Sequence, residues 1–390
     1  MIQSKSYNII SHETLLIIFL LSLMSPAIGI TIPGLGTLKA SMLLSYFIIF
    51  TNYKCKFNLL KITPILLLLL FYGISSIWSI SYSHSIIGII GILQLIIYCF
   101  SFSILLSQYN KNEIITILIK SFTIMAFLTL IYYTLSVFTY TGGYDDNIKY
   151  YGMMIDRSMI RAKGFTDDPN IFSLYMGIAL AIILFNKNTK KIPTLLIFLM
   201  FVLTLSRGGI IAFIGSSAIV FIFEFIISPA KQFKKILLFT LILTILFTIV
   251  HFNETIYHII DKRLNDISSG SGRFDLWNSA FRYFFENPIF GHGIFTTKYI
   301  FEMILGKPAY THNTFIELLL EGGISLLFVY LLLFFYLFIL LFKNIKENLW
   351  LISCLVFIFI QFMTLSLSFN EFVYFIFIII LLFNNKQQVI

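Results

Sequence analysis

Charged residues are scarce in this chain. Only 12% of its 390 residues are Asp, Glu, Lys or Arg, whereas 58% are hydrophobic, and the mean hydropathy is +0.92. A soluble globular protein of this composition could not cover its apolar surface with polar side chains, so that class is excluded. The apolar runs extend from residue 15 to residue 383. They predict an all-α polytopic membrane protein with a single integral domain over residues 1–390.

Cysteine and the common cofactor motifs are also rare or absent. Cys55, Cys99 and Cys354 lie in one basic loop and two apolar runs without CxxC spacing, so neither a disulfide framework nor a zinc site is expected. The chain has no GxGxxG, Walker A or GxSxG sequence, and its paired aspartates lack DxD spacing. We therefore expect no metal and no cofactor. The net charge of +9 is explained by membrane topology rather than by binding to nucleic acid.

Twelve apolar runs predict about twelve transmembrane helices. They lie near residues 15–32, 38–51, 63–80, 85–107, 114–139, 170–185, 192–205, 209–227, 236–251, 324–342, 349–367 and 371–383. The first run is expected to be retained as a span rather than removed as a signal peptide, because the chain re-enters the membrane repeatedly. Several runs are shorter than the roughly 20 residues that cross a bilayer without tilt, so some spans should be kinked or partial.

The distribution of basic residues predicts the orientation. With both termini in the cytoplasm, fourteen lysines face inward, whereas the opposite short loops hold only Lys39 and Arg207. Two long segments, 140–169 and 252–323, then form outer loops. All six arginines then fall on the outer side: Arg157, Arg161, Arg207, Arg263, Arg273 and Arg282. The guanidinium group suits bidentate recognition of phosphate or carboxylate, so this asymmetry indicates an anion site. A chance distribution in a lysine-rich sequence is the alternative.

Arg207 stands between two apolar runs in the sequence TLSRGGII. An arginine in hydrocarbon costs on the order of 2–3 kcal/mol, so we expect Arg207 to face a polar cavity and bind an anion. The two glycines that follow allow backbone or ligand to approach closely. The alternative is an arginine that snorkels at the end of a helical hairpin.

Residues 273–287 predict an amphipathic helix on the outer membrane surface. Its apolar face is formed by Phe274, Trp277, Phe281 and Phe284. Arg273 begins this helix, where a cation is unfavourable unless an anion is brought to it. Arg282 has the spacing of a helical ion pair with Glu286. His292 lies between two glycines and is either a turn residue or a substrate ligand.

The sequence THNTFIELLLEGG predicts a second helix that begins beside a histidine. Thr314 and Glu317 have the spacing of a capping box, so the helix should begin at Thr314, with His312 and Asn313 just ahead of it. Such a helix end attracts anions, and His312 suits proton transfer near neutral pH; an ordinary surface neighbour of the cap is the alternative. The Gly322–Gly323 pair predicts a break before the next span.

Between residues 164 and 330 the series GFTDDPN, SRGG, SGRFDLW…NPIFGHGIF and THNTFIELLLEGG resembles the O-antigen polymerase and O-antigen ligase superfamily of bacterial inner-membrane glycosyltransferases. The resemblance implies a GT-C-like fold with the 252–323 loop as a large helical periplasmic loop over the active site. It also implies undecaprenyl-diphosphate-linked glycans as donors, used without metal. The family's functional arginines correspond to Arg207 and Arg273, and its histidine corresponds to His312.

These three residues are the predicted catalytic residues: the arginines would hold the pyrophosphate, and His312 would act as general base on a sugar hydroxyl. The further predicted substrate-binding residues are Arg157, Arg161, Lys163, Asn313, Arg282 and His292. The expected partners are a lipid-linked oligosaccharide donor and acceptor, membrane lipid and a chain-length regulator protein.

Two alternatives to a polymerase remain open. A ligase would transfer the glycan to lipid A–core, and only the compact length and the DDPN sequence favour the polymerase. The second alternative is a transporter. It is suggested by Lys120, Glu224 and Glu371, because ionisable residues in spans often mark ion paths. The two related halves common in transporters are not found in the sequence.

Overall fold

The computed structural model describes residues 11–32, 36–52, 57–143, 147–156, 159–185, 191–229 and 273–383. These residues form thirteen α-helices, one short 3₁₀ helix and two small antiparallel sheets. The helices are α1 (His12–Leu23), α2 (Ala40–Thr51), α3 (Leu59–Ile74), η1 (Ser75–Trp78), α4 (Tyr82–Leu106), α5 (Lys111–Thr139), α6 (Pro169–Phe185), α7 (Lys191–Leu203), α8 (Arg207–Ile227), α11 (Arg273–Phe284), α12 (Thr297–Leu305), α13 (Thr314–Phe342), α14 (Ile345–Phe362) and α15 (Glu371–Phe383). The strands are β1 (Gly29–Ile32), β2 (Gly36–Lys39), β3 (Ile148–Tyr150), β4 (Met153–Asp156) and β5 (Met159–Ala162).

The chain is a polytopic membrane protein. Among the described residues, six helical segments are long and apolar enough to cross a membrane, namely α3 with η1, α4, α5, α8, α13 and α14. Five shorter apolar helices, α1, α2, α6, α7 and α15, accompany them. Eleven of the twelve predicted spans overlap these helices, and the span at 236–251 lies outside the described residues. The number twelve and the GT-C-like fold therefore stay predictions.

One predicted boundary is wrong. The first span was expected to reach residue 32, but α1 ends at Leu23, and Gly29–Ile32 is a strand paired antiparallel with Gly36–Lys39. The three consecutive β-branched residues of this strand, Ile30, Thr31 and Ile32, favour extended backbone over helix. The apolar composition was read as helix because a short apolar run does not separate the two.

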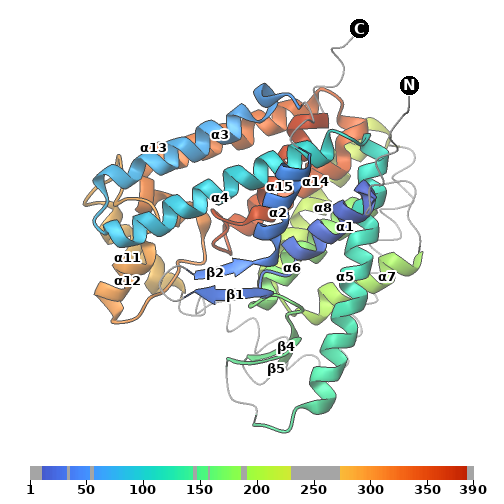
Figure 1. Ribbon diagram of the computed structural model, residues 1–390, viewed down its shortest axis with the longest axis horizontal. Coiled ribbons are helices and arrows are strands. Elements are labelled where there is room, and N and C mark those ends of the chain that lie inside the picture. The colour runs from blue at the N-terminus through green and yellow to red at the C-terminus, as the bar shows by residue number, and fades with distance from the viewer. Residues whose placement is uncertain are drawn as a thin grey trace.

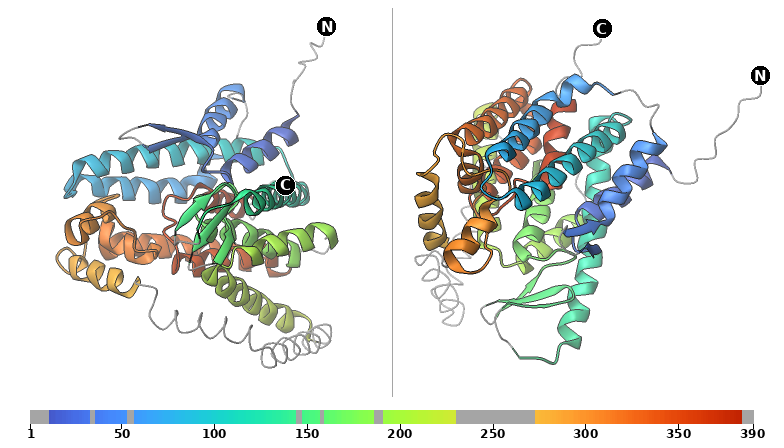
Figure 2. Two further views of the ribbon diagram at one scale, coloured as in Figure 1. Left: turned by 90° about the horizontal axis from the view of Figure 1, so that it is seen from below. Right: turned by 60° about the vertical axis from the view of Figure 1, so that its left-hand side comes forward.

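Helix α15 is the central element. Its residues from Glu371 to Leu382 are all buried, and it packs against α3, α4, α13 and α14. In Figures 1 and 2, α3, α4 and α13 run side by side, and α11 and α12 lie at the end of α13 where that helix begins. Helices α6 and α8 both pack against α14 in the remaining part of the bundle.

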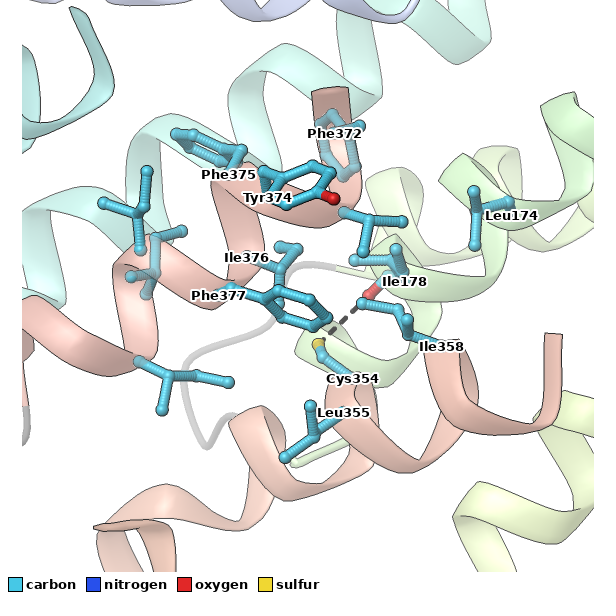
Figure 3. Close-up of a cluster of buried hydrophobic side chains, with 14 of the residues drawn as sticks. Leu174, Ile178, Cys354, Leu355, Ile358, Phe372, Tyr374, Phe375, Ile376 and Phe377 are labelled. Carbon is cyan, nitrogen blue, oxygen red and sulfur yellow. Dashed lines mark hydrogen bonds between the residues drawn. The ribbon is translucent and has the colours of Figure 1, made fainter. Parts of the chain in front are cut away.

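The core between α6, α14 and α15 is closely packed (Figure 3). An added Cβ at Gly177 of α6 would lie 2.1 Å from Phe357 Cζ of α14, so only glycine allows this ring to fit. Cys354 is buried there, with Sγ 4.0 Å from the carbonyl oxygen of Ile178. The thiol acts as a small apolar side chain, as expected from the lack of a partner cysteine in its sequence neighbourhood.

The two predicted outer loops contain structured elements. Residues 140–169 hold the sheet of order β3-β4-β5, which is antiparallel throughout. The described part of the 252–323 loop, from residue 273, holds α11, α12 and the start of α13, whereas residues 252–272 lie outside the described residues. Their assignment to the periplasmic side remains a prediction.

Candidate active site

The candidate site is built around the α14–α15 connection, residues 363–370. Its backbone carbonyl groups are acceptors for residues from two other elements. Arg273, the first residue of α11, donates from Nη1 to the carbonyl oxygen of Thr364 at 3.2 Å. Thr314, the first residue of α13, donates from Oγ1 to the carbonyl oxygen of Leu365 at 2.6 Å. The starts of α11 and α13 are thereby fixed next to each other.

The SRGG turn meets the same connection. Arg207 begins α8, and Ser206 caps that helix by accepting from the backbone N–H of Gly209 at 3.2 Å. An added Cβ at Gly208 would lie 2.7 Å from Thr364 Oγ1. Glycine is therefore needed where α8 begins against the connection, and the half-buried Arg207 is carried to the region that holds Arg273.

The DDPN sequence joins this arrangement from α6. Asp168 Oδ1 accepts from the backbone N–H of Asn170 at 2.8 Å, and Pro169 is the first residue of α6, so Asp168 caps this helix and proline occupies its first position. Asn170 does more than the sequence indicated. Its Oδ1 accepts from Ser206 Oγ at 2.8 Å, which ties the start of α6 to the start of α8.

Arg161 lies behind this contact and is only 6% exposed. Its guanidinium donates to the carbonyl oxygen of Thr204, to Asp156 Oδ2 and to Asn170 Oδ1, at 2.9, 2.9 and 3.0 Å. All three nitrogen atoms of the Arg161 guanidinium group therefore donate to acceptors within the protein. We therefore assign Arg161 to the framework that holds the SRGG turn, rather than to direct contact with substrate.

The cap of α13 differs from the prediction. Asn313, not Thr314, is the N-cap, because its Oδ1 accepts from the backbone N–H groups two and three residues further on, at 3.0 and 3.2 Å. The Thr314 hydroxyl is used by the α14–α15 connection, and the Glu317 carboxylate accepts from Ser366 Oγ instead of closing a capping box. The predicted helix start was right and the predicted capping box was wrong.

His312 occupies a strained turn just before this cap. Its φ is +52°, which costs a non-glycine residue about 1–2 kcal/mol. The flanking residues hold the turn: Thr311 Oγ1 donates to the carbonyl oxygen of Asn313 at 2.8 Å, and Trp277 Nε1 of α11 donates to the carbonyl oxygen of Thr311 at 2.8 Å. The turn thus fixes the direction of the His312 side chain relative to α11.

The electrostatics of His312 favour the neutral imidazole. Burial lowers its pKa below the ordinary 6.5, and the positive charge of Arg273 lowers that pKa further, whereas Asp168 opposes the shift. A histidine with a lowered pKa is neutral at pH 7 and can accept a proton. The same interactions bring residues of the predicted GR, HN and DDPN motifs within electrostatic range of one another.

Four helices begin around this point. Their first residues are Pro169 (α6), Arg207 (α8), Arg273 (α11) and Thr314 (α13). The N-terminus of a helix carries a partial positive charge and free N–H groups. Two of these four ends begin with an arginine, so the site is suited to an anion such as a diphosphate.

The remaining predicted residues lie outside this group or within the framework. Lys163 is buried, donates to the carbonyl oxygen of Thr166 at 3.1 Å, and has a pKa lowered by burial, an effect that Asp167 opposes and Lys149 reinforces. Arg157 lies outside the described residues.

Arg282 and His292 lie near the end of α11 that is opposite Arg273. Arg282 is exposed. Within the described residues its expected ion pair with Glu286 is not formed, because α11 ends at Phe284 and Glu286 lies in the turn that follows. His292 is 2% exposed, and its Nε2 lies 2.7 Å from the carbonyl oxygen of Tyr283. The turn interpretation of His292 is therefore favoured over a substrate ligand.

A family model described as O-antigen ligase matches residues 192–331. This region contains the SRGG turn, α11, α12 and the His312 turn. Over these residues the chain is similar to the O-antigen ligase family. The predicted resemblance to the ligase and polymerase superfamily is confirmed, and the match indicates an activity of that type without separating the two. No curated protein matches the chain.

The matched region, residues 192–331, also contains the predicted helix break. Gly323 of α13 has φ +66° and ψ −167°, and an added Cβ would lie 2.3 Å from the carbonyl oxygen of Ile289. The loop at 288–293 pairs with the broken helix. Its bonds are Ile324 N to Pro288 O (2.9 Å), Ser325 N to Ile289 O (3.3 Å), His292 N to Leu320 O (2.9 Å) and Gly293 N to Glu321 O (2.8 Å). The loop therefore satisfies backbone groups that the break frees, as a kink within a membrane protein requires.

Sequence analysis missed two buried carboxylates in the matched region. Glu317 and Glu321 of α13 are each 4% exposed. Glu321 accepts from the hydroxyl of Tyr72, from Thr297 Oγ1 at 2.6 Å, and from the backbone N–H groups of Phe295 and Thr297 at 2.9 and 3.3 Å. Their spacing of four residues in an otherwise apolar run places both on one helix face, a signal that could have identified them.

Proposed function

We propose that the protein is an O-antigen polymerase of the bacterial inner membrane. It transfers an undecaprenyl-diphosphate-linked glycan to a sugar hydroxyl of a second lipid-linked repeat unit on the periplasmic face. The observation that carries this proposal is the convergence of Arg207, Arg273 and His312 where four helix N-termini meet the α14–α15 connection. Two arginines and helix ends favour a diphosphate, and a neutral histidine beside them favours proton abstraction.

The chemistry is a glycosyl transfer. The acceptor hydroxyl oxygen forms a bond to the anomeric carbon of the donor sugar while the bond from that carbon to the diphosphate oxygen breaks. The hydroxyl proton passes to the unprotonated ring nitrogen of His312, and the bonding electrons leave with the diphosphate. Arg207 and Arg273 stabilise the negative charge that develops on this leaving group.

A ligase is the second candidate, because the matching family description is O-antigen ligase. Its acceptor would be lipid A–core, and the test below separates it from the polymerase. A transporter has less support. Two of the three ionisable residues that suggested a transporter form ion pairs: Glu371 Oε1 lies 2.8 Å from Lys39 Nζ, and Lys120 Nζ lies 2.5 Å from Glu13 Oε1. Paired charges are compensated within the protein and do not indicate an ion path.

The proposal is tested by complementing a deletion strain of the source bacterium and separating its lipopolysaccharide on a gel, with membrane abundance measured for each variant. The variants are Arg273→Ala, Arg273→Lys and His312→Ala, and Lys307→Ala is the matched control for an exposed cation of the same loop. Loss of one charge-stabilising donor or of a general base reduces the rate by roughly 10²- to 10⁴-fold. We therefore expect a full ladder from wild type and Lys307→Ala, and core plus one repeat unit from the other variants.

Two results would decide against this function. If bare core accumulates together with lipid-linked polymer, the protein is a ligase. If the ladders of Arg273→Ala and His312→Ala match that of wild type at equal abundance, the site itself is wrong.

A further inference from the structure

A row of five aromatic rings extends from the edge of the candidate site along the C-terminal end of α5 and the β3–β4 turn. We call it the aromatic ladder: Phe165, Tyr132, Tyr151, Tyr150 and Tyr140. Phe165 and Tyr132 are stacked at 4.8 Å with an interplanar angle of 5°. The next three ring centroids follow at spacings of 6.0, 4.6 and 5.2 Å. None of these rings was given a role by the catalytic chemistry.

The aromatic ladder starts at the site. Phe165 lies three residues before Asp168, which caps α6 and whose negative charge raises the pKa of His312. The backbone carbonyl of Gly152, next to Tyr151, accepts from the N–H groups of Lys163 and Gly164 at 3.0 and 3.2 Å. The turn that carries the outer rings is therefore bonded to the strand end that leads into the DDPN sequence.

The outer rings are held in place and remain accessible. Tyr151 is 59% exposed and adopts φ +43°, a conformation that costs a non-glycine residue free energy. Gly152 docks the turn on α5, because its N–H donates to Ser136 Oγ at 2.9 Å and an added Cβ would lie 2.8 Å from the backbone of Tyr132. A large ring is thus presented to the surroundings at a position where folding alone would favour glycine or asparagine.

We propose that the aromatic ladder binds the sugar rings of the glycan and guides the chain away from the reaction centre. This inference rests on the proposed function. All five rings have an apolar face for the C–H face of a pyranose, and the four tyrosines add a hydroxyl for its edge, which suits a carbohydrate better than an acyl chain. Four of the five rings are tyrosines, and the sheet beside them carries the exposed Lys149 in β3 and the Asp156–Arg161 ion pair between β4 and β5, a polar setting for a soluble glycan rather than hydrocarbon.

The test measures binding of O-polysaccharide released from the source bacterium's lipopolysaccharide by mild acid, using saturation-transfer NMR with the full-length protein in nanodiscs. The variants are Tyr151→Ala and Tyr151→Phe, with Tyr82→Ala as the matched control, because Tyr82 is 70% exposed at the start of α4. Loss of one stacking contact should raise the dissociation constant roughly 2- to 10-fold. We expect this loss for Tyr151→Ala only, and a shift of its gel ladder toward shorter chains.

Unchanged binding by Tyr151→Ala, or equal weakening by Tyr82→Ala, would overturn the proposal. A Tyr151→Ala variant that binds polysaccharide normally but inserts less stably into the membrane would identify the rings as interfacial anchors instead. Transfer to a single-repeat acceptor should survive Tyr151→Ala and be lost in Arg273→Ala. Failure of the proposed function would show in Arg273→Ala and failure of the ladder in Tyr151→Ala, so the two are distinguishable.

Discussion

Glu321→Gln tests whether a buried carboxylate holds the loop after α11 against α13. In the structure each carboxylate oxygen of Glu321 has two donors: Thr297 bonds Oε1 through its hydroxyl and its N–H, and the hydroxyl of Tyr72 and the N–H of Phe295 bond Oε2. An amide can present only one oxygen. Whichever way the substituted side chain is oriented, its NH₂ group faces one hydroxyl and one backbone N–H. The hydroxyl can turn to accept from the NH₂ group, but the backbone N–H loses its acceptor.

The expected cost follows from that count. The backbone N–H left without an acceptor costs about 1–3 kcal/mol, and the other donors no longer bond a charged group, so the total destabilisation should be roughly 2–6 kcal/mol. Tyr72→Phe removes one donor and leaves Oε2 with the N–H of Phe295, so its cost should be roughly 1.5–3 kcal/mol. The double variant should cost less than the sum of the two, because both changes remove the same bond.

Thermal unfolding of purified protein in one detergent measures these effects, with Glu302→Gln, an exposed carboxylate of α12, as the control. We expect a lowered Tm for Glu321→Gln, a smaller decrease for Tyr72→Phe, and none for the control. A protonated glutamic acid is closely mimicked by glutamine. A Tm of Glu321→Gln equal to that of wild type would therefore refute a four-donor carboxylate clamp.

Three further predictions concern the site and the core. Asp168→Asn removes the charge that raises the pKa of His312, so that pKa should fall and the acidic limb of the transfer rate against pH should move to lower pH, as measured with a lipid-linked repeat unit. Arg161→Lys removes the guanidinium group that bonds three acceptors, so the free energy of unfolding should fall by about 2–4 kcal/mol. A lower Tm and a lower membrane abundance would show this loss, whereas an unchanged Tm would contradict the framework role of Arg161. Gly177→Ala overpacks the Phe357 ring and should destabilise the fold by roughly 1–3 kcal/mol. The control is Gly73→Ala in α3, where an added Cβ would lie in ordinary contact, 3.5 Å from Ile92 Cδ1.

Sequence reasoning predicted the helices and the side chains that carry charge. Long apolar runs predict spans because hydrocarbon leaves the backbone no other partner, and eleven of the twelve runs coincide with helices of the described residues. Motif reading also selected Arg273, Arg207 and His312, which lie on segments that the fold brings together. Local signals sufficed here because each motif also begins a helix, and helix starts have a recognisable sequence pattern.

The predictions failed where a side chain had a choice of partners. Thr314 and Glu317 have the spacing of a capping box, but tertiary contacts with the α14–α15 connection supply better-placed partners for both. The spacing is a local property, and the competing acceptor lies about fifty residues away in the chain. A local rule could not detect this competition, and the neighbouring Asn313 was equally suited to act as the cap.

The α14–α15 connection was overlooked because it contributes mainly backbone groups. Arg273 and Thr314 bond the carbonyl oxygens of Thr364 and Leu365, and every residue type provides such a carbonyl. Substitution of Thr364 should therefore affect Arg273 little unless the new residue changes the backbone or collides with Gly208. A site whose acceptors are main-chain atoms cannot be read from residue identities; it is defined by where α14 ends, and that is decided by the packing of α14 between α6 and α8.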